Sequence, residues 1–374
     1  MAQTSESQSS GGEKSEDGSI LVPFTLRREY LHRETGFGSF FLEMPSLVED
    51  ISKIHKNPYP KVVLLVNDKD KNQKECLKII RDLNHENILR VEFWEEVSNE
   101  PHIRVYVEPY TAIISELFQN FESLINPRTN MIPSQSLEEI VSATMGALDY
   151  IRDNNQYHGN FSWKTTFYHL VNGNVIVKLA NFERKNSNDL LQCQVEDVTS
   201  LGASLEALSQ HLKDNYPNVK NYTYCLIDDL ARKLKSVTKD SIGTVKRDLQ
   251  DHEFFWDEKR TKIFFAYEVP GIWNDTAIQN RFRLSPSMPT LPWTAAWASD
   301  PLMVEMERYR SNNGLGDYDG ESLADFFRFI SGMYTHENEL RKTLKNEKLS
   351  IDAEVRKKYP SLCHDLNAAI RGDA

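Results

Sequence analysis

The sequence predicts an α+β protein in which a small, strand-rich part is followed by a much longer helical part. Up to about residue 112, short β-branched runs surround a single helical pattern. Beyond that point, apolar residues recur with the period of an α-helix over several long stretches. A chain of 374 residues is long enough for two such domains.

The strand-rich part is predicted in the order strand, helix, strand, strand. Residues 61–68, KVVLLVND, form a compact apolar run bounded by Pro60 and by charges, which is typical of a buried strand. Residues 74–84 place apolar side chains at helical spacing. Further strands are expected at residues 88–93 and 103–107.

The helical part begins with a capping signal. Ser136 is predicted to cap a helix, because Glu139 completes a capping box and apolar residues follow with helical period. Two short extended segments are expected at residues 168–171 and 175–179. Further helical stretches are predicted at residues 197–212, 224–265 and 321–369, with Pro286, Pro289 and Pro292 between the last two.

Composition places the chain among intracellular proteins without a membrane span. Residues 1–18 are rich in Ser, Gly and Glu, and we expect a disordered tail there. No apolar run approaches the length of about 18 residues that a spanning helix needs. The cytoplasm is the expected location, with the nucleus as the alternative. Reduced thiols are expected at the four scattered cysteines, Cys76, Cys193, Cys225 and Cys363.

The net charge of −11 does not favour nucleic-acid binding by the chain as a whole. The acidity is concentrated early, because residues 221–374 contain 22 Lys and Arg against 24 Asp and Glu. A locally basic groove in the second half is therefore compatible with the composition.

Several short motifs follow the order in which protein kinases carry their catalytic residues. HGNFSWKTT (residues 158–166) follows the capped helix, and NFE (181–183) follows the extended pair. DVTSLG (197–202) begins the next helix, while Glu75 and HENI (85–88) belong to the earlier helix and its end. In order and spacing, this region resembles a protein kinase.

The resemblance implies a degenerate bilobal kinase fold over residues 19–250, with the strand-rich part as its small lobe. His158 stands at the His of the catalytic loop, but Asn160 stands at the catalytic Asp. Thr165 and Asn181 stand at the two metal-binding positions. An amide cannot accept a proton near pH 7, and it binds magnesium weakly. The sequence thus predicts a pseudokinase without a metal site.

The cation that should contact the phosphates is also missing. Residues 62–66 are all Val or Leu, so no register of this strand supplies a lysine, and Glu75 lacks its usual partner. Lys61, Lys69 and Lys164 are the nearby alternatives. Neither phosphoryl transfer nor a bound nucleotide cofactor is expected.

Three segments near the C-terminus resemble the kinase-extension nuclease (KEN) domain of the ribonuclease L and inositol-requiring-enzyme family. They are HEFFW (252–256), GDYDGESLADFFRFISGMYTHENEL (316–340) and KKYPSL (357–362). The resemblance implies an all-α domain over residues 251–374. It also implies metal-independent RNA cleavage, in which the ribose 2′-hydroxyl attacks the adjacent phosphate.

The nuclease positions are only half retained. Alignment on DFFRFI (325–330) places Tyr318 and His336 at the Tyr and His of the family's site. Ser331 and Gly332 stand at the family's Arg and Asn. Acid and base candidates are therefore present, while the pair that stabilises the developing phosphate charge is lost.

Two alternatives remain for this site. Arg328 or Arg341 is the candidate replacement for the missing cation. Tyr318 is otherwise a loop aromatic, and His336 is otherwise a surface or capping histidine.

The leading hypothesis is a non-catalytic regulatory or scaffold protein. It would pair with itself or with a related kinase–nuclease protein, or bind RNA without cutting it. The alternative is a weak or narrowly specific endoribonuclease that leaves 2′,3′-cyclic phosphate ends. A nucleotide-binding kinase-like protein is the third reading.

Overall fold

The computed structural model describes residues 41–43, 62–67, 71–96, 102–108, 110–118, 135–171, 174–185, 187, 189–215 and 222–372. The chain forms two compact units, the first comprising Met1–Leu117 with Ala143–Asp197 and the second comprising Phe118–Ser142 with Val198–Ala374.

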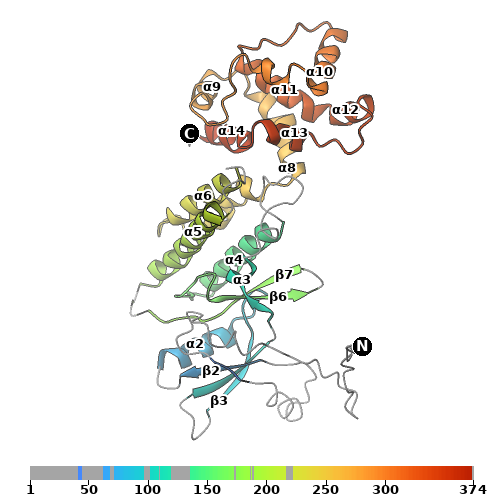
Figure 1. Ribbon diagram of the computed structural model, residues 1–374. Helices are drawn as coiled ribbons and strands as arrows, with labels where there is room; N and C mark the ends of the chain where they lie inside the picture. Colours follow the sequence, from blue (N-terminus) through green and yellow to red (C-terminus); the bar gives the residue numbers. More distant parts are fainter. Residues whose placement is uncertain are drawn as a thin grey trace, which may run out of the picture. The chain divides into compact units, whose positions relative to one another are not determined.

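The first unit contains a four-stranded antiparallel sheet with the strand order β1-β2-β4-β3 (Figure 1). Its strands are β1 (Phe41–Glu43), β2 (Val62–Asn67), β3 (Val91–Glu96) and β4 (His102–Val107). The strands predicted at residues 61–68 and 103–107 are confirmed. The strand predicted at 88–93 begins three residues later than expected.

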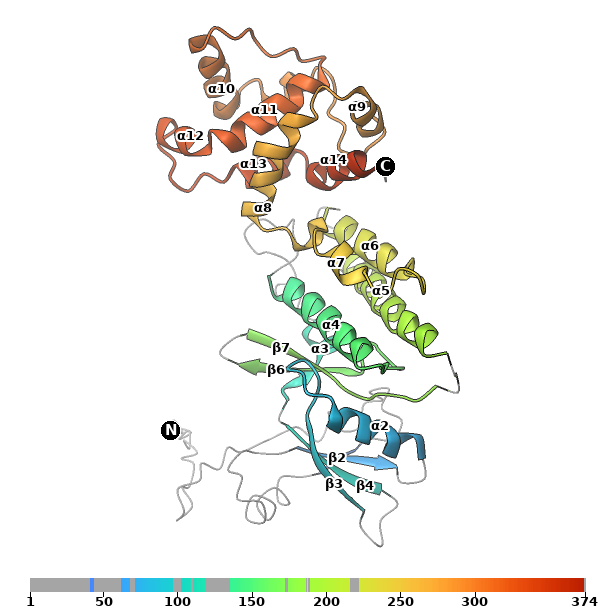
Figure 2. The same ribbon diagram turned by 180° about the vertical axis from the view of Figure 1, so that it is seen from behind.

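Helix α2 (Lys71–Asp82) lies beside this sheet in both views of the chain (Figures 1 and 2). Cys76, Leu77 and Ile80 are buried at helical spacing, which explains why this stretch forms an amphipathic helix. The helix expected at residues 74–84 is therefore confirmed, with an earlier start.

A second, three-stranded sheet has the strand order β5-β6-β7. The elements are β5 (Ala112–Ile113), which leads into α3 (Ile114–Leu117), then β6 (Thr166–Val171) and β7 (Asn174–Leu179). The backbone of Leu179 exchanges hydrogen bonds of 2.8 Å with the Asn87 carbonyl and the Leu89 amide. Those bonds fasten β7 to the chain after α2. Both predicted extended segments are confirmed.

Two long helices begin earlier than the sequence suggested. α4 is Gln135–Asp153, so Ser136 lies within its first turn and not before it. The predicted capping box is therefore wrong in detail, although the apolar side of the helix is buried as expected. α5 is Leu190–Asn215 and starts seven residues before the predicted position, with the Asp189 carboxylate accepting from the Gln192 amide at 3.0 Å.

Residues 222–372, which are all described, contain helices and turns and no strand. The helices are α6 (Tyr222–Lys235), α7 (Val245–Leu249), α8 (Glu258–Ile263), α9 (Thr276–Phe282), α10 (Pro301–Asn312), α11 (Leu323–Thr335), α12 (Glu337–Thr343), α13 (Ile351–Lys358) and α14 (Leu362–Arg371). Shorter helical turns cover Glu253–Phe255, Phe264–Glu268, Val269–Gly271 and Trp293–Trp297.

Helix α11 is the centre of this helical part, contacting α10, α12 and α13 (Figure 2). Its apolar residues are packed with Trp293 and Trp297 in a core made only of residues after Asp251. Ser322 caps the helix, because its hydroxyl accepts from the Asp325 amide at 3.2 Å. The N-terminal cap and the core contacts of α11 together set the position of its last turn, which ends at Thr335.

The observed element order is that of a kinase-like fold, a mixed and helix-rich α+β arrangement. The domain boundary after residue 250 and the KEN-like character of residues 251–374 stay predictions. None of the described helices is both long and apolar enough to cross a membrane.

Candidate functional site

The loop that corresponds to a kinase catalytic loop is held by a buried carboxylate. Asp197 accepts from the backbone amides of His158 at 2.6 Å and Gly159 at 2.8 Å. The Glu183 amide donates to the His158 carbonyl at 2.9 Å, and the His158 ring stacks on Phe182 with centroids 4.5 Å apart. The two motifs HGN and NFE are thus held together by a backbone hydrogen bond and a ring contact.

Burial sets the protonation of this framework. Burial lowers the pKa of His158 to about 4, so the imidazole is neutral at physiological pH. Burial also raises the pKa of Asp197 to about 6, although the two backbone amides lower it. His158 therefore packs as an uncharged ring and brings no positive charge to the loop.

The three replaced positions do not present charge to a phosphate. Asn160 offers its backbone carbonyl to the Thr165 hydroxyl, at 2.9 Å. Thr165 is buried, and its hydroxyl lies 3.1 Å from the Ser162 carbonyl, so it is engaged within the loop. Asn181 is half-buried and adopts a left-handed backbone with φ of +60°.

Cations near these motifs already face carboxylates. Lys178 on β7 pairs with Glu108 at 2.9 Å, and Lys185 pairs with Glu196. Glu75, which the sequence left without a partner, lies 4.0 Å from the Arg184 guanidinium.

The sequence had suggested three other lysines as replacements. Lys164 is exposed, and Lys61 and Lys69 lie outside the described residues. Among the described cations near the motifs, Lys178, Arg184 and Lys185 thus face carboxylates, whereas Lys164 is exposed.

In the second unit, Tyr318 lies against the central aromatic core with a cation over its ring. Its ring packs edge-on against Trp293 and Phe329 at centroid distances of 5.7 and 5.4 Å. The Arg310 guanidinium carbon lies 4.3 Å from the Tyr318 ring centroid, and Nε of Arg310 donates to the Gly316 carbonyl at 2.6 Å. Arg310 is a site residue that sequence reasoning missed.

The Tyr318 hydroxyl is strongly held in its protonated form. Burial raises the pKa of Tyr318 to about 12, while the Arg310 charge acts in the opposite direction. At pH 7 only about one molecule in 10⁵ carries the phenolate. Tyr318 is therefore suited to donate a hydrogen bond and not to act as a base.

His336 lies at the junction of α11 and α12. Its backbone amide donates to the Gly332 carbonyl at 2.9 Å, and its ring packs on Tyr309 with centroids 4.3 Å apart. A Cβ atom at Gly332 would lie 3.9 Å from the Tyr318 hydroxyl, and residues four apart on a helix share a face. The Tyr318 hydroxyl therefore lies beside Gly332, while α10 supplies Tyr309, which packs on His336, and Arg310, which packs on Tyr318.

A larger side chain at either position of the family's lost pair would require neighbouring atoms to move, which is harder at the buried Ser331 than at Gly332, where the neighbour is a flexible methionine. Ser331 is only 3% exposed, so an arginine there would have to displace core atoms. A Cβ at Gly332 would lie 2.5 Å from the Met306 methyl carbon.

Both cations suggested as replacements are engaged elsewhere. Arg328 pairs with Asp325 at 2.7 Å. Arg341 pairs with Glu337, also at 2.7 Å, and donates to the Leu349 carbonyl.

A buried charged cluster surrounds the HEFFW motif, where the family has Pro and this chain has Glu253. His252 Nε2 lies 2.8 Å from the Asp229 carboxylate, and His252 Nδ1 accepts from the Phe254 amide at 3.1 Å. Ligand atoms of Asp229, His252 and Glu253 lie within 4.8 Å of one another, which is short enough to hold a metal ion. Because both nitrogens of His252 are already hydrogen-bonded, the cluster fits a structural network better than a metal site.

Glu253 extends this network to the last helix. Its carboxylate contacts Asn367, lies 3.2 Å from the Arg371 guanidinium and lies 3.8 Å from His364 Nδ1. The cluster thus joins α6, the turn that begins at Glu253, and α14.

The network predicts a pH-dependent contribution to stability. Burial lowers the pKa of His364, but the carboxylates of Glu253, Asp229 and Asp365 together raise it more, and the net shift is upward. The charges around Glu253 outweigh its burial and lower its pKa to about 2. His364 therefore stabilises the fold below its ordinary pKa of about 6.5, and this contribution is lost as pH rises through its raised pKa.

We expect the stability difference between the parent chain and His364→Gln to be largest below the ordinary histidine pKa of about 6.5 and to shrink as the pH rises through the raised pKa of His364. Thermal unfolding of both proteins across this range measures it. Taking the difference removes the opposite effect of His158, which is buried in its neutral form. A difference that does not change with pH would contradict an ionic role for His364.

No family model matches the sequence, and no curated protein matches it. Among solved structures, the chain is similar to the autoinhibited serine kinase domain of the giant muscle protein titin, with 15% identity and a TM-score of 0.40 over 54% of this chain and 73% of that chain. It is also similar to Rad53 1–466 in complex with AMP-PNP, with 13% identity and a TM-score of 0.38 over 54% of this chain and 59% of that chain. Likenesses at this level establish no activity. The kinase-like reading therefore rests on the element order and the loop contacts described above.

Proposed function

We propose that this chain is a non-catalytic regulatory or scaffold protein built on a kinase-like fold. One observation carries the proposal: Asp197 still holds the catalytic-loop backbone in place, while Asn160, Thr165 and Asn181 supply no charge. Phosphoryl transfer depends on carboxylates that bind magnesium and face the substrate hydroxyl, and on a lysine at the phosphates. A kinase-like framework that lacks these groups is suited to binding other proteins and not to phosphoryl transfer.

A phosphate-transfer assay tests the proposal. We expect no transfer by the parent chain, and none by the double variant Asn160→Asp with Asn181→Asp, because β2 still lacks a lysine. The matched control is Asn154→Asp, an exposed amide outside the motifs. Magnesium-dependent transfer by the parent chain that Asn160→Ala abolishes would contradict the proposal.

Self-pairing is the partner arrangement that the resemblance to kinase–nuclease proteins suggests. Sedimentation velocity of the purified chain over a range of concentrations measures it directly. A chain that stays monomeric would limit the scaffold role to other partners.

The second candidate function is weak, metal-independent RNA cleavage, and the Arg310 contact with Tyr318 favours it. In this reaction the ribose 2′-oxygen bonds to the adjacent phosphorus and loses its proton, and the 5′-oxygen leaves with a proton. His336 is the candidate for proton transfer, Arg310 for stabilising the phosphate charge and Tyr318 for donating a hydrogen bond. The product would carry a 2′,3′-cyclic phosphate.

We expect cleavage of an RNA hairpin in EDTA to be at least about 10²-fold slower than in an enzyme with a complete set of charged donors. His336→Ala and Arg310→Gln should each remove residual cleavage, while Arg283→Gln, at an exposed position on another surface, should not. Residual cleavage that survives both site variants would contradict the assigned roles.

A further inference from the structure

A hollow of about 900 Å³ lies at the C-terminal end of α12, away from the aromatic core. It is lined by Asn338, Arg341, Lys342, Lys345, Asn346, Glu347 and Lys348. The lining therefore has four cationic side chains against a single carboxylate, and of the four only Arg341 already pairs with a carboxylate, that of Glu337. This excess of positive charge lies in a chain whose net charge is −11.

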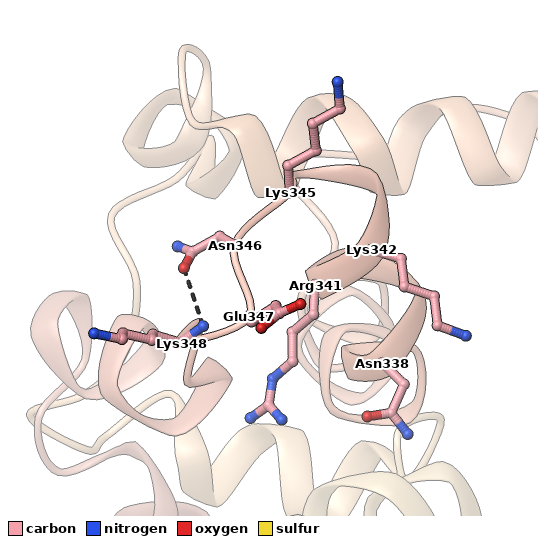
Figure 3. Close-up of a pocket in the computed structure, with 7 residues that line it drawn as sticks. All are labelled: Asn338, Arg341, Lys342, Lys345, Asn346, Glu347 and Lys348. Atoms are coloured by element: carbon pink, nitrogen blue, oxygen red, sulfur yellow. Dashed lines mark hydrogen bonds between the residues drawn. The ribbon is translucent and has the colours of Figure 1, made fainter.

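Hydrogen bonds hold the backbone around the hollow in a defined conformation. Lys345 adopts a left-handed conformation with φ of +51°, which reverses the chain after α12. The Asn346 amide then donates to the Arg341 carbonyl at 3.0 Å, and the Asn346 side chain accepts from the Lys348 amide at 3.2 Å (Figure 3). Nε of Arg341 fastens the returning segment through the Leu349 carbonyl at 2.7 Å.

The lysines of the hollow are available to a ligand. Lys342, Lys345 and Lys348 are exposed and form no ion pair within residues 222–372, which are all described. Figure 3 shows the three lysines extending in different directions from α12 and from the loop that follows it. Charges that spread in this way do not converge on one small anion, but they suit a chain of successive negative charges.

The chemistry of the lining distinguishes between kinds of polyanion. Every lining residue is polar or charged, and none is aromatic or aliphatic. Protein partners usually need a buried apolar or aromatic anchor, whereas a phosphate backbone is held by cations alone. Without aromatic rings, the hollow also offers no platform on which bases could stack.

We infer that this hollow binds the phosphate backbone of a nucleic acid, without sequence preference. The inference goes beyond the proposed scaffold function, and it requires no cleavage at Tyr318 or His336. RNA and DNA present the same phosphate chemistry to it, so the two are separated by experiment.

Fluorescence anisotropy with single-stranded RNA and DNA of about 20 nucleotides, measured over a series of salt concentrations, tests the inference. The full chain should bind RNA with an affinity that falls steeply with salt. The variant Lys342→Gln, Lys345→Gln, Lys348→Gln should bind about tenfold or more weakly, and its salt slope should be smaller by about 2. Equal losses for RNA and DNA would identify the phosphates as the shared ligand.

The matched control removes three exposed cations elsewhere, Lys78→Gln, Lys259→Gln and Arg283→Gln, and should bind like the parent. Glu347→Gln removes the one carboxylate of the hollow and should tighten binding. Because that variant gains affinity, a folding defect cannot imitate its result.

Three results would overturn the inference. They are no binding of either nucleic acid, equal losses in the hollow and control variants, and binding of polyglutamate in place of nucleic acid. The last result would indicate an acidic protein partner. None of the three bears on phosphoryl transfer, so failure here is distinguishable from failure of the proposed scaffold function.

Discussion

Replacing Gly159 by alanine is expected to destabilise the first unit by about 3 to 5 kcal/mol, because backbone strain and a steric overlap both oppose the added methyl group. Gly159 has φ of +81°, a left-handed conformation that side chains disfavour. A Cβ at this position would also overlap the Glu183 carbonyl oxygen. Relieving this overlap would require moving apart the HGN and NFE motifs, which the contacts of Asp197 and Phe182 hold together.

Urea unfolding measures this effect, and two alanine controls separate its causes. Gly314 has φ of +70° with open space around its Cβ, so Gly314→Ala isolates the backbone strain at about 1 kcal/mol. Gly243→Ala meets neither problem and should be neutral. If Gly159→Ala proved no more costly than Gly314→Ala, the close approach of Glu183 to the loop would be wrong.

Replacing Glu253 by alanine is expected to destabilise the second unit by about 2 to 4 kcal/mol. The side chain is only 1% exposed, and its removal leaves His364 and Arg371 without their shared carboxylate. Arg371 is 30% exposed and regains some hydration, which places the cost below that of a fully buried pair. The loss should be felt most at α14, whose side chains lose their link to α6.

Urea unfolding and limited proteolysis of the C-terminal segment measure this second effect. Glu258→Ala removes an exposed carboxylate five residues later and serves as the matched control. Release of α14 at a lower protease concentration in Glu253→Ala alone is the expected outcome. Equal behaviour of the two variants would show that the buried network does not hold the last helix.

Much of the first unit was predictable because its signals are local. The apolar run that became β2 and the helical period of α4 are properties of neighbouring residues, and burial along α4 follows its period. The early start of α5 was missed although its first turn, residues 190–193, is largely apolar. The capping carboxylate of Asp189 was the overlooked signal.

The candidate nuclease site was predictable only in part, for a physical reason. The assignment of Tyr318 and His336 as an acid–base pair stays a prediction, although the Tyr318 hydroxyl lies beside Gly332, about one helical turn before His336. Arg310 reaches Tyr318 because the loop after α10 folds back onto that helix, which no periodic pattern encodes. The buried Glu253 was likewise visible only as a departure from the family motif.

Binding of ATP with magnesium tests the central claim most directly, because that claim is the loss of phosphate-handling charge from a preserved kinase-like framework. Thermal unfolding of the chain at about 1 mM ATP with magnesium should show no stabilisation relative to magnesium alone. Bound nucleotide at about 100 times its Kd would add about 2.7 kcal/mol. A magnesium-dependent rise of that size, removed by Asn181→Ala, would contradict the account.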